Sequence, residues 1–185
     1  MKLSWIAPMT LLAPLCLANS ATASNFTSPK QLSTQSRLIA QSNWKQVSSS
    51  TGKFTVNMPG KPTENTEKDE DGLTSKSFTL SSDSGYYSVI YLDFSEIGEI
   101  NSAQAKQFLD MVPSKFSEGA GAKLLNHRSI TLTGYQGKEF TFAINPKMRG
   151  KGRAYFANNK LYILMAIAPE TASFNTFLNS FRFLA

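Results

Sequence analysis

Hydrophobic and polar residues alternate with a period of two along much of this chain, which is typical of β-strands. A short alternating segment spans Lys53–Met58 and ends at Pro59, and another lies around Leu73–Leu80. The segments Tyr86–Phe94 and Lys160–Ala168 are instead apolar at almost every position. Because a strand of that kind has both faces covered, these two segments are predicted to lie at the centre of a sheet.

Two other segments have the apolar spacing of an amphipathic helix. The first begins after Asn101 or Ser102, and Asn101 can form a capping box with Gln104. Pro113 lies inside it and predicts a kink or a break into two short helices. The second follows Pro169. The apolar positions of the first segment are Ala105, Phe108, Leu109, Val112 and Phe116, and those of the second are Phe174, Phe177, Leu178 and Phe181.

Three more alternating segments between these helices predict further strands. Their apolar positions are Ile130 and Leu132, then Phe140, Phe142 and Ile144, then Ala154 and Phe156. The polar segment 64–72, ENTEKDEDG, is predicted to be a charged loop. The order of elements predicts an α+β fold. More closely, it predicts an α/β/α sandwich with a largely antiparallel central sheet of about six to seven strands and a helix on each face.

The N-terminal residues 1–23 have the layout of a secretory signal peptide, with one lysine, an apolar stretch and a cleavage site after Ala23. The alternative is a lipoprotein signal at Cys16, but the preceding Leu15 is larger than such a signal requires. Residues 24–43 are rich in Ser, Thr, Gln and Asn, so we expect a flexible lead-in. The remaining chain, 44–185, is predicted to be a single globular domain that is exported to the periplasm, the thylakoid lumen or the medium.

Composition narrows the chemistry of this domain. Cys16 is the single cysteine of the 185 residues, so the mature domain is expected to contain no disulfide and no cysteine-bound metal. The chain carries a formal net charge of +6, and the charges are unevenly distributed. Acidic residues dominate between Glu64 and Glu99, whereas Lys and Arg dominate between Lys123 and Lys160, with Glu139 as the single acid there. Such asymmetry favours association with an anionic surface.

The most basic segment is NPKMRGKGRAYF, residues 145–156. We predict a β-hairpin in which Asn145-Pro146 ends one strand and Gly150 and Gly152 allow the bend. The expected partner contacts are Lys147, Arg149, Lys151 and Arg153, the first three exposed to solvent and the last entering the strand. The predicted partner is an acidic protein surface or an anionic membrane surface. Nucleic acid is disfavoured because an exported protein rarely meets it, and one hairpin offers few phosphate contacts.

Catalytic patterns are weak. His127 is the one histidine of the chain, so a hydrolase would have to use it as its base. The acidic residues of 64–71 could bind calcium, but their spacing is not that of a calcium loop. The sequence therefore predicts a protein that is not an enzyme, with no residue assigned to a cofactor or a metal. The alternative function is a small-ligand carrier with an aromatic pocket between sheet and helix, lined by Tyr86 and Tyr162.

Several loose signatures recur in an order that resembles a known family. They are the F-x-V-x-M-P pattern at 54–59, Gly137 with Glu139, the Leu-Tyr pair at 161–162 and the FLNSF run at 177–181. Over roughly residues 44–183 the chain is similar to the PsbP-like superfamily, which takes its name from the extrinsic subunit of photosystem II and has small exported relatives in cyanobacteria.

The resemblance implies an α/β/α sandwich around an antiparallel sheet, in agreement with the periodicity. It further implies a non-catalytic accessory or assembly factor at the lumenal or periplasmic side of a membrane complex. The domain itself is expected to be a monomer. No metal ligand of that family can be carried onto a residue of this chain.

Overall fold

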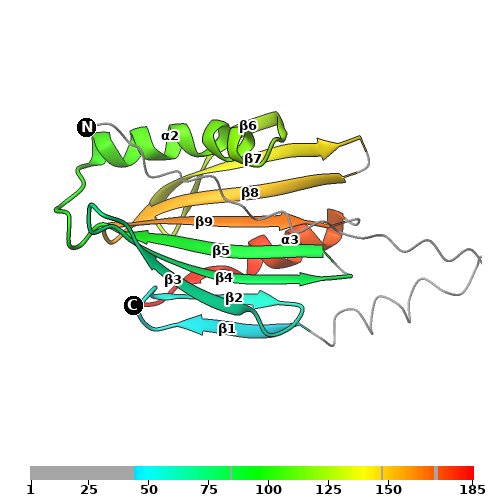
Figure 1. The fold of residues 1–185 in the computed structure, drawn as a ribbon, viewed down its shortest axis with the longest axis horizontal. Helices are drawn as coiled ribbons and strands as arrows, with labels where there is room; N and C mark the ends of the chain where they lie inside the picture. Colours follow the sequence, from blue (N-terminus) through cyan, green and yellow to red (C-terminus); the bar gives the residue numbers. More distant parts are fainter. Residues whose placement is uncertain (1–43, 84, 147, 169–170) are drawn as a thin grey trace, which may run out of the picture.

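The computed structural model describes residues 44–185 apart from 84, 147 and 169–170, and the predicted signal peptide and lead-in lie outside this range (Figure 1). The described elements are β1 (Lys45–Ser49), β2 (Phe54–Met58), β3 (Thr63–Lys68), β4 (Thr74–Ser82), β5 (Gly85–Asp93), α2 (Ser102–Gly119), β6 (Lys123–Leu132), β7 (Tyr135–Asn145), β8 (Met148–Ala157), β9 (Lys160–Ile167), α3 (Thr171–Ser180) and β10 (Arg182–Phe183).

Seven of these strands form one antiparallel sheet in the order β3-β4-β5-β9-β8-β7-β6, and β1, β2 and β10 form a second, small sheet. The two segments that are apolar on both faces, β5 and β9, pair directly near the middle of the large sheet. The predicted α+β fold with a largely antiparallel sheet and two covering helices is therefore confirmed.

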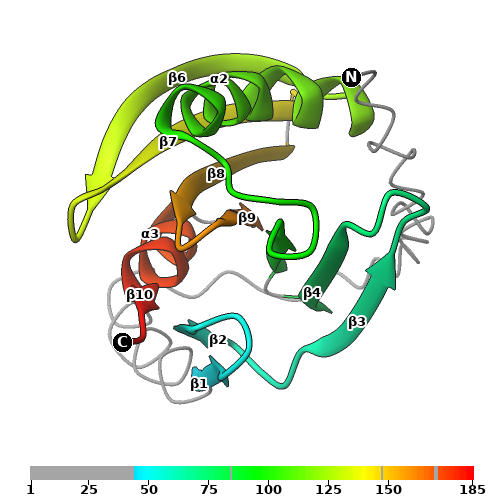
Figure 2. The same cartoon turned by 90° about the vertical axis from the view of Figure 1, so that its left-hand side faces the viewer.

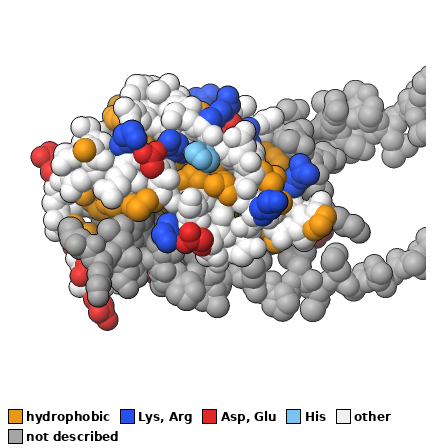
Figure 3. Space-filling view, turned by 90° about the horizontal axis from the view of Figure 1, so that it is seen from above, with side chains coloured by type: hydrophobic (Ala, Val, Ile, Leu, Met, Phe, Trp, Pro, Cys, Tyr) orange, Lys and Arg blue, Asp and Glu red, His pale blue; other side chains and the backbone are white. Residues whose placement is uncertain are grey.

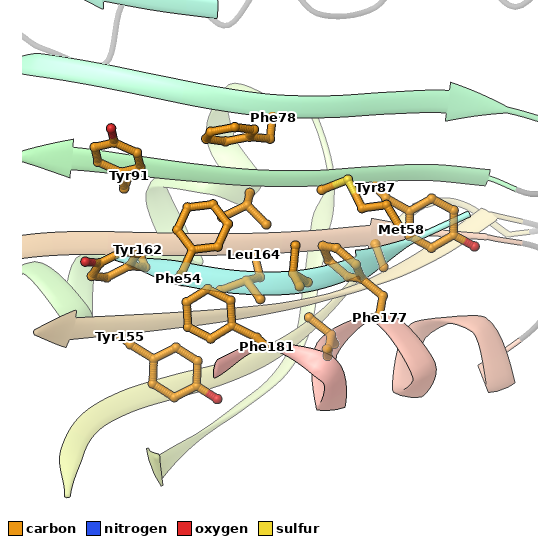
Figure 4. Close-up of a cluster of buried hydrophobic side chains, with 14 of the residues drawn as sticks. Phe54, Met58, Phe78, Tyr87, Tyr91, Tyr155, Tyr162, Leu164, Phe177 and Phe181 are labelled. Carbon is orange, nitrogen blue, oxygen red and sulfur yellow. The ribbon is translucent and has the colours of Figure 1, made fainter. Parts of the chain in front are cut away.

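The two faces of the large sheet are covered by different elements. Alternate residues of β9 point to opposite sides. Tyr162 and Leu164 join a core with α3 and the small sheet, whereas Leu161 lies in the core beneath α2. We call these sides the α3 face and the α2 face. The α3 face is packed with aromatic rings, among them Phe54 stacked on Phe181 at 5.5 Å between centroids (Figure 4).

Helix α2 begins as the sequence predicts. The side chain of Asn101 accepts a hydrogen bond from the Gln104 backbone N–H, and the Gln104 side chain accepts one from the Asn101 N–H, which completes the capping box. Of the two alternatives for Pro113, a kink or a break, the break into two short helices is wrong, because one helix runs from Ser102 to Gly119. Pro113 is buried against the sheet, and its carbonyl accepts a hydrogen bond from the Ser117 hydroxyl at 2.8 Å. Packing thus keeps the helix continuous through the proline.

The segment 64–72 is not simply a charged loop. Its first part belongs to β3, a strand that is exposed at every position and pairs with β4 from Thr63↔Thr79 to Lys68↔Thr74. A strand without a buried face has no apolar alternation, so the sequence gives no local signal for it. Its formation follows from backbone pairing with β4, whose Phe78 is fully buried.

The glycines of the basic segment do not form the bend either. Gly150 and Gly152 lie inside β8, directly opposite Phe142 and Phe140 of β7. A Cβ at either glycine would meet the Cζ atom of the opposite phenylalanine ring at 2.3 Å. Both glycines are therefore needed because the two rings lie over them on the α2 face, where Phe142 also packs against Phe116 of α2.

The two helices lie over different parts of the large sheet. Helix α2 packs on β6, β7 and β8, whereas α3 packs on β2, β8 and β9. Figure 2 shows β6 and β7 at one rim of the sheet and β3 at the other. Two corners of the sheet consequently remain mostly exposed or half-buried: the α3 face of β6–β7 with the adjoining part of β8, and the α2 face of β3–β4.

A cationic corner of the sheet as the candidate interaction site

The α3 face of β6, β7 and β8 carries five basic residues from the second half of the chain. Residues directly opposite each other in an antiparallel pair point to the same side. Register places Arg128, Glu139 and Arg153 in one row across the three strands, and Thr141 and Lys151 in the next. We call this surface the cationic corner. Its members are Lys123, Asn126, Arg128, Glu139, Thr141, Arg149, Lys151 and Arg153.

Glu139 lies at the centre of the cationic corner and is the single acidic member. Only 6% of its side chain is exposed. Arg128 donates to its Oε1 atom from Nη2 at 2.8 Å and from Nε at 3.1 Å. Arg153 donates to Oε2 from Nε at 2.8 Å, and Lys151 Nζ lies 3.3 Å from Oε1. Three cations therefore surround one carboxylate.

This arrangement keeps Glu139 ionised. Burial by itself opposes the charge, but the hydrogen bonds from Arg153 and Arg128, with the charges of Arg153 and Lys151, outweigh it and hold the pKa of the carboxyl below its ordinary value. One negative charge balances only one of the three cations. The cationic corner thus retains an excess of positive charge at neutral pH, and Arg128 presents much of it to solvent because 68% of its side chain is exposed.

Arg153 has a different place from the one expected for a partner contact. Besides Glu139, its guanidinium donates from Nη1 to the carbonyl of Leu178 at 3.0 Å and from Nη2 to Oδ1 of Asn179 at 2.9 Å. Its side chain is 17% exposed. Arg153 therefore ties β8 to the end of α3 and holds Glu139, and each of its three nitrogens is already engaged.

The other three residues predicted to contact a partner, Lys147, Arg149 and Lys151, have different outcomes. Lys147 lies outside the described residues. Arg149 is exposed, and within the described ranges no ion pair involves it. The prediction that Lys151 is exposed to solvent is wrong, because only 21% of its side chain is accessible beside Glu139. Its cross-strand neighbour on β7, Thr141, is half-buried as well, so this row of the surface remains partly open to solvent.

Comparison with known proteins gives a fold and no family. No protein-family model matches the chain, and no curated protein matches it. Among solved structures, the chain resembles the solution structure of cyanobacterial PsbP (CyanoP) from Synechocystis sp. PCC 6803. The TM-score is 0.51 at 14% sequence identity, over 76% of this chain and 92% of that chain. The likeness shows a PsbP-like fold. Neither α2 nor α3, the helices of the described chain, is long and apolar enough to cross a membrane.

The sequence did not assign Arg128 and Lys123 to this surface, although one signal for it exists. The turn between β6 and β7 consists of Thr133 and Gly134, both with positive φ, at 47° and 86°. A two-residue turn fixes the register of the hairpin. Counting outwards from this turn pairs Arg128 with Glu139, as the structure has it.

His127 lies on the other side of β6. It points to the α2 face, where its direct cross-strand neighbour is the ring of Phe140 and not a nucleophile or a carboxylate. A shallow hollow is lined by residues of β6 and β7, namely Asn126, His127, Arg128, Glu139, Phe140 and Thr141. In Figure 3 the histidine is exposed among Lys and Arg side chains, with hydrophobic side chains beside it. The carboxylate that lines this hollow, Glu139, points to the opposite face and is bound by Arg128 and Arg153, so it is not placed to orient His127 as in a hydrolase triad.

Tyr86 and Tyr162 cannot line one ligand pocket. Tyr162 pairs with Tyr91 and points to the α3 face, where it is fully buried and donates to the Gly52 carbonyl at 2.9 Å. Burial raises its pKa. Tyr86 is an odd number of residues from Tyr91 on the same strand, so it points to the α2 face. The pocket expected from these two tyrosines is therefore wrong in its geometry.

The acidic residues around β3 are mostly engaged with their own neighbours. Glu64 pairs with Lys76 at 3.0 Å, and Glu96 pairs with Lys68 at 2.6 Å. The Oδ1 atom of Asp69 accepts the backbone N–H of Leu73 at 2.7 Å. Within 44–185, leaving out 84, 147 and 169–170, no group of three or more His, Cys, Asp or Glu residues could hold a metal ion.

Proposed function

We propose that this protein is a non-catalytic, exported binding or assembly module, and that it serves as an accessory factor for a photosynthetic membrane complex on the periplasmic or lumenal side. The observation that carries the proposal is the cationic corner, where three cations converge on the single carboxylate of Glu139. The secretory layout of residues 1–23 and a fold shared with a cyanobacterial PsbP support the compartment and the class of complex.

The partner that fits this surface is an acidic protein surface. Arg149 is exposed and can make forked hydrogen bonds to a carboxylate. Arg128 is also exposed and, while it donates to Glu139 from Nε and Nη2, can donate to a partner from Nη1. Lys151 adds a point charge from the next row, and Lys147 is a further basic residue of the segment 145–156. Arg153 acts indirectly by holding Glu139 and the α3 end in place. The protein acts as a monomer, and association is steered by the excess positive charge.

Affinity purification tests the proposal. The tagged chain from residue 24 onwards is incubated with detergent-solubilised membranes of the source organism, and the retained proteins are identified. The wild type should retain a membrane complex, whereas the double variant Lys147→Glu/Arg149→Glu should lose it. Arg149 is exposed and is not among the described ion-pair partners of Glu139, so its replacement should keep the fold.

The matched control is Lys61→Glu/Lys68→Glu, which changes the net charge equally near the opposite edge of the sheet. This control should retain the complex. Equal recovery by the wild type and both variants would remove the cationic corner from the proposal, and recovery of no membrane complex by the wild type would end it.

A further inference from the structure

The strand β6 is an edge with an open hydrogen-bonding side. It stands last in the seven-stranded order, and β7 is its one strand neighbour among the described residues. A bulge at Leu125 interrupts the pairing, after which seven consecutive residues, Asn126–Leu132, pair regularly with β7. Half of the backbone N–H and C=O groups of an edge strand point away from its sheet, and an added strand can pair with them.

The two edges of this sheet differ in how they are protected. At β3 the edge is short, and Glu64, Glu67 and Lys68 lie within its six residues. Charges of this density discourage strand addition. At β6 the regular part carries one charge, Arg128, and the following run Ser129–Leu132 has none. Among the described strands, the β6 edge is thus the less protected one, and its cation, Arg128, lies near the N-terminal end of the regular part.

The side chains along β6 specify what could be added. Arg128, Ile130 and Leu132 all point to the α3 face, since they pair with Glu139, Gly137 and Tyr135. Ile130 and Leu132 are half-buried and pack against the aromatic core, so they present apolar surface beside the edge. A segment lying along β6 would therefore meet a cation at one end and apolar surface at the other.

We propose that β6 binds an extended, acidic protein segment as an added strand, with apolar side chains against Ile130 and Leu132 and a carboxylate against Arg128. The inference rests on the proposed function, because it names the mode by which an acidic partner reaches the cationic corner. The added strand would be antiparallel to β6, so its acidic residues, beside Arg128, would lie towards its own C-terminal end. Main-chain hydrogen bonds supply affinity, and the Arg128 pair sets the register.

Synthetic peptides test this mode directly. The probe is the fluorescent peptide TVTVTETE, which carries the expected pattern, and binding to the full mature chain is followed by anisotropy. The same peptide with N-methyl groups on alternate backbone amides keeps every side chain but cannot pair with an edge. We expect binding of the unmodified peptide and a loss of about tenfold or more on methylation, because several hydrogen bonds are removed together.

Two further comparisons locate the site. The wild-type protein should bind the peptide TVTVTKTK severalfold more weakly than TVTVTETE, and the variant Arg128→Gln should bind TVTVTETE severalfold more weakly than the wild type does. The variant Glu67→Lys, at the β3 edge, should bind TVTVTETE as the wild type does. Amide hydrogen exchange should slow in 126–132 when the peptide is bound. Equal binding of the methylated peptide, protection confined to another strand, or no binding of TVTVTETE would each overturn strand addition. The membrane retention lost in Lys147→Glu/Arg149→Glu is measured separately, so the proposed function can stand if this mode fails.

Discussion

Two corners of the same sheet are left open by the offset of α2 and α3, yet they differ in chemistry. On the α2 face of β3–β4 the side chains are mostly neutral, and we call this surface the polar corner; its members are Thr63, Asn65, Glu67, Ser75, Ser77 and Thr79. On the α3 face of β6–β8 an equally open surface carries the cations that converge on Glu139.

The difference teaches that exposure of a sheet corner does not by itself indicate a binding site. Hydroxyl side chains on β4 carry no charge and can bond to a neighbouring hydroxyl, as in the 3.3 Å contact between Thr79 of β4 and Ser88 of β5. Uncompensated positive charge held in fixed positions is different, because it attracts anions over a distance. Four predictions test this contrast, beginning with the largest expected effect.

The side of the sheet behind the cationic corner should be intolerant of added volume. In Gly152→Val the new side chain would meet the Phe140 ring, whose Cζ lies 2.3 Å from an ideal Cβ. We expect the free energy of unfolding to fall by about 3 kcal/mol, the upper range for overpacking. Urea denaturation provides the measurement. The matched change Ser77→Val in the polar corner should shift stability by less than about 0.5 kcal/mol. Comparable losses in the two variants would show that the sheet behind the cationic corner is packed no more tightly than the polar corner.

Neutralising the carboxylate of the cationic corner should cause the second-largest loss of stability. Glu139→Gln leaves Arg153 and Lys151 without their counter-charge at sites of low exposure. The expected loss is about 2 kcal/mol, below the range for fully buried pairs because the Arg128 partner is solvated. Glu67→Gln in the polar corner is the control and should be close to neutral. A Glu139→Gln protein as stable as the wild type would mean that the cluster adds nothing to folding.

The same pair of proteins predicts a pH dependence. The pKa of Glu139 is lowered in the folded state relative to its ordinary value of 4.5, so its contribution to stability is present above that value and is lost as the pH falls through the folded-state pKa. The stability difference between wild type and Glu139→Gln should therefore shrink below about pH 4.5. Chemical denaturation across this pH range measures it. A difference that stays constant would show that the carboxylate charge is not the cause.

The smallest effect on stability is expected for Arg128→Gln. Its side chain is 68% exposed, so the pair with Glu139 is largely screened by water, and the loss should be below about 1 kcal/mol. The exposed pair of Lys68 with Glu96 at the other edge should behave alike in Lys68→Gln. A much larger loss in Arg128→Gln alone would identify Arg128 as part of the folding core and not of a contact surface.

The parts of the fold that the sequence predicts well depend on neighbours in the chain or on burial of whole strands. The capping box of Asn101 with Gln104 is local, and the apolar runs of β5 and β9 indicate their central position directly. The strand β3 gave no such signal because each of its residues is exposed.

The candidate site was predictable only in part, because it is assembled from several strands. The basic residues of β8 are visible in the sequence, but their engagement depends on Glu139 from β7 and on the end of α3. The interpretation of Gly152 as a bend residue failed for the same reason, since the ring that requires it comes from the neighbouring strand. Long-range register, and not local propensity, decides both.

Site-specific photocrosslinking in solubilised membranes tests the central claim most directly. Benzoylphenylalanine replaces either Thr141 in the cationic corner or Ser77 in the polar corner, two half-buried strand positions of the same sheet. We predict a crosslink to a membrane-complex subunit from position 141 and none from position 77. Equal crosslinking from both positions, or crosslinking from position 77 alone, would contradict the assignment of the cationic corner as the contact surface.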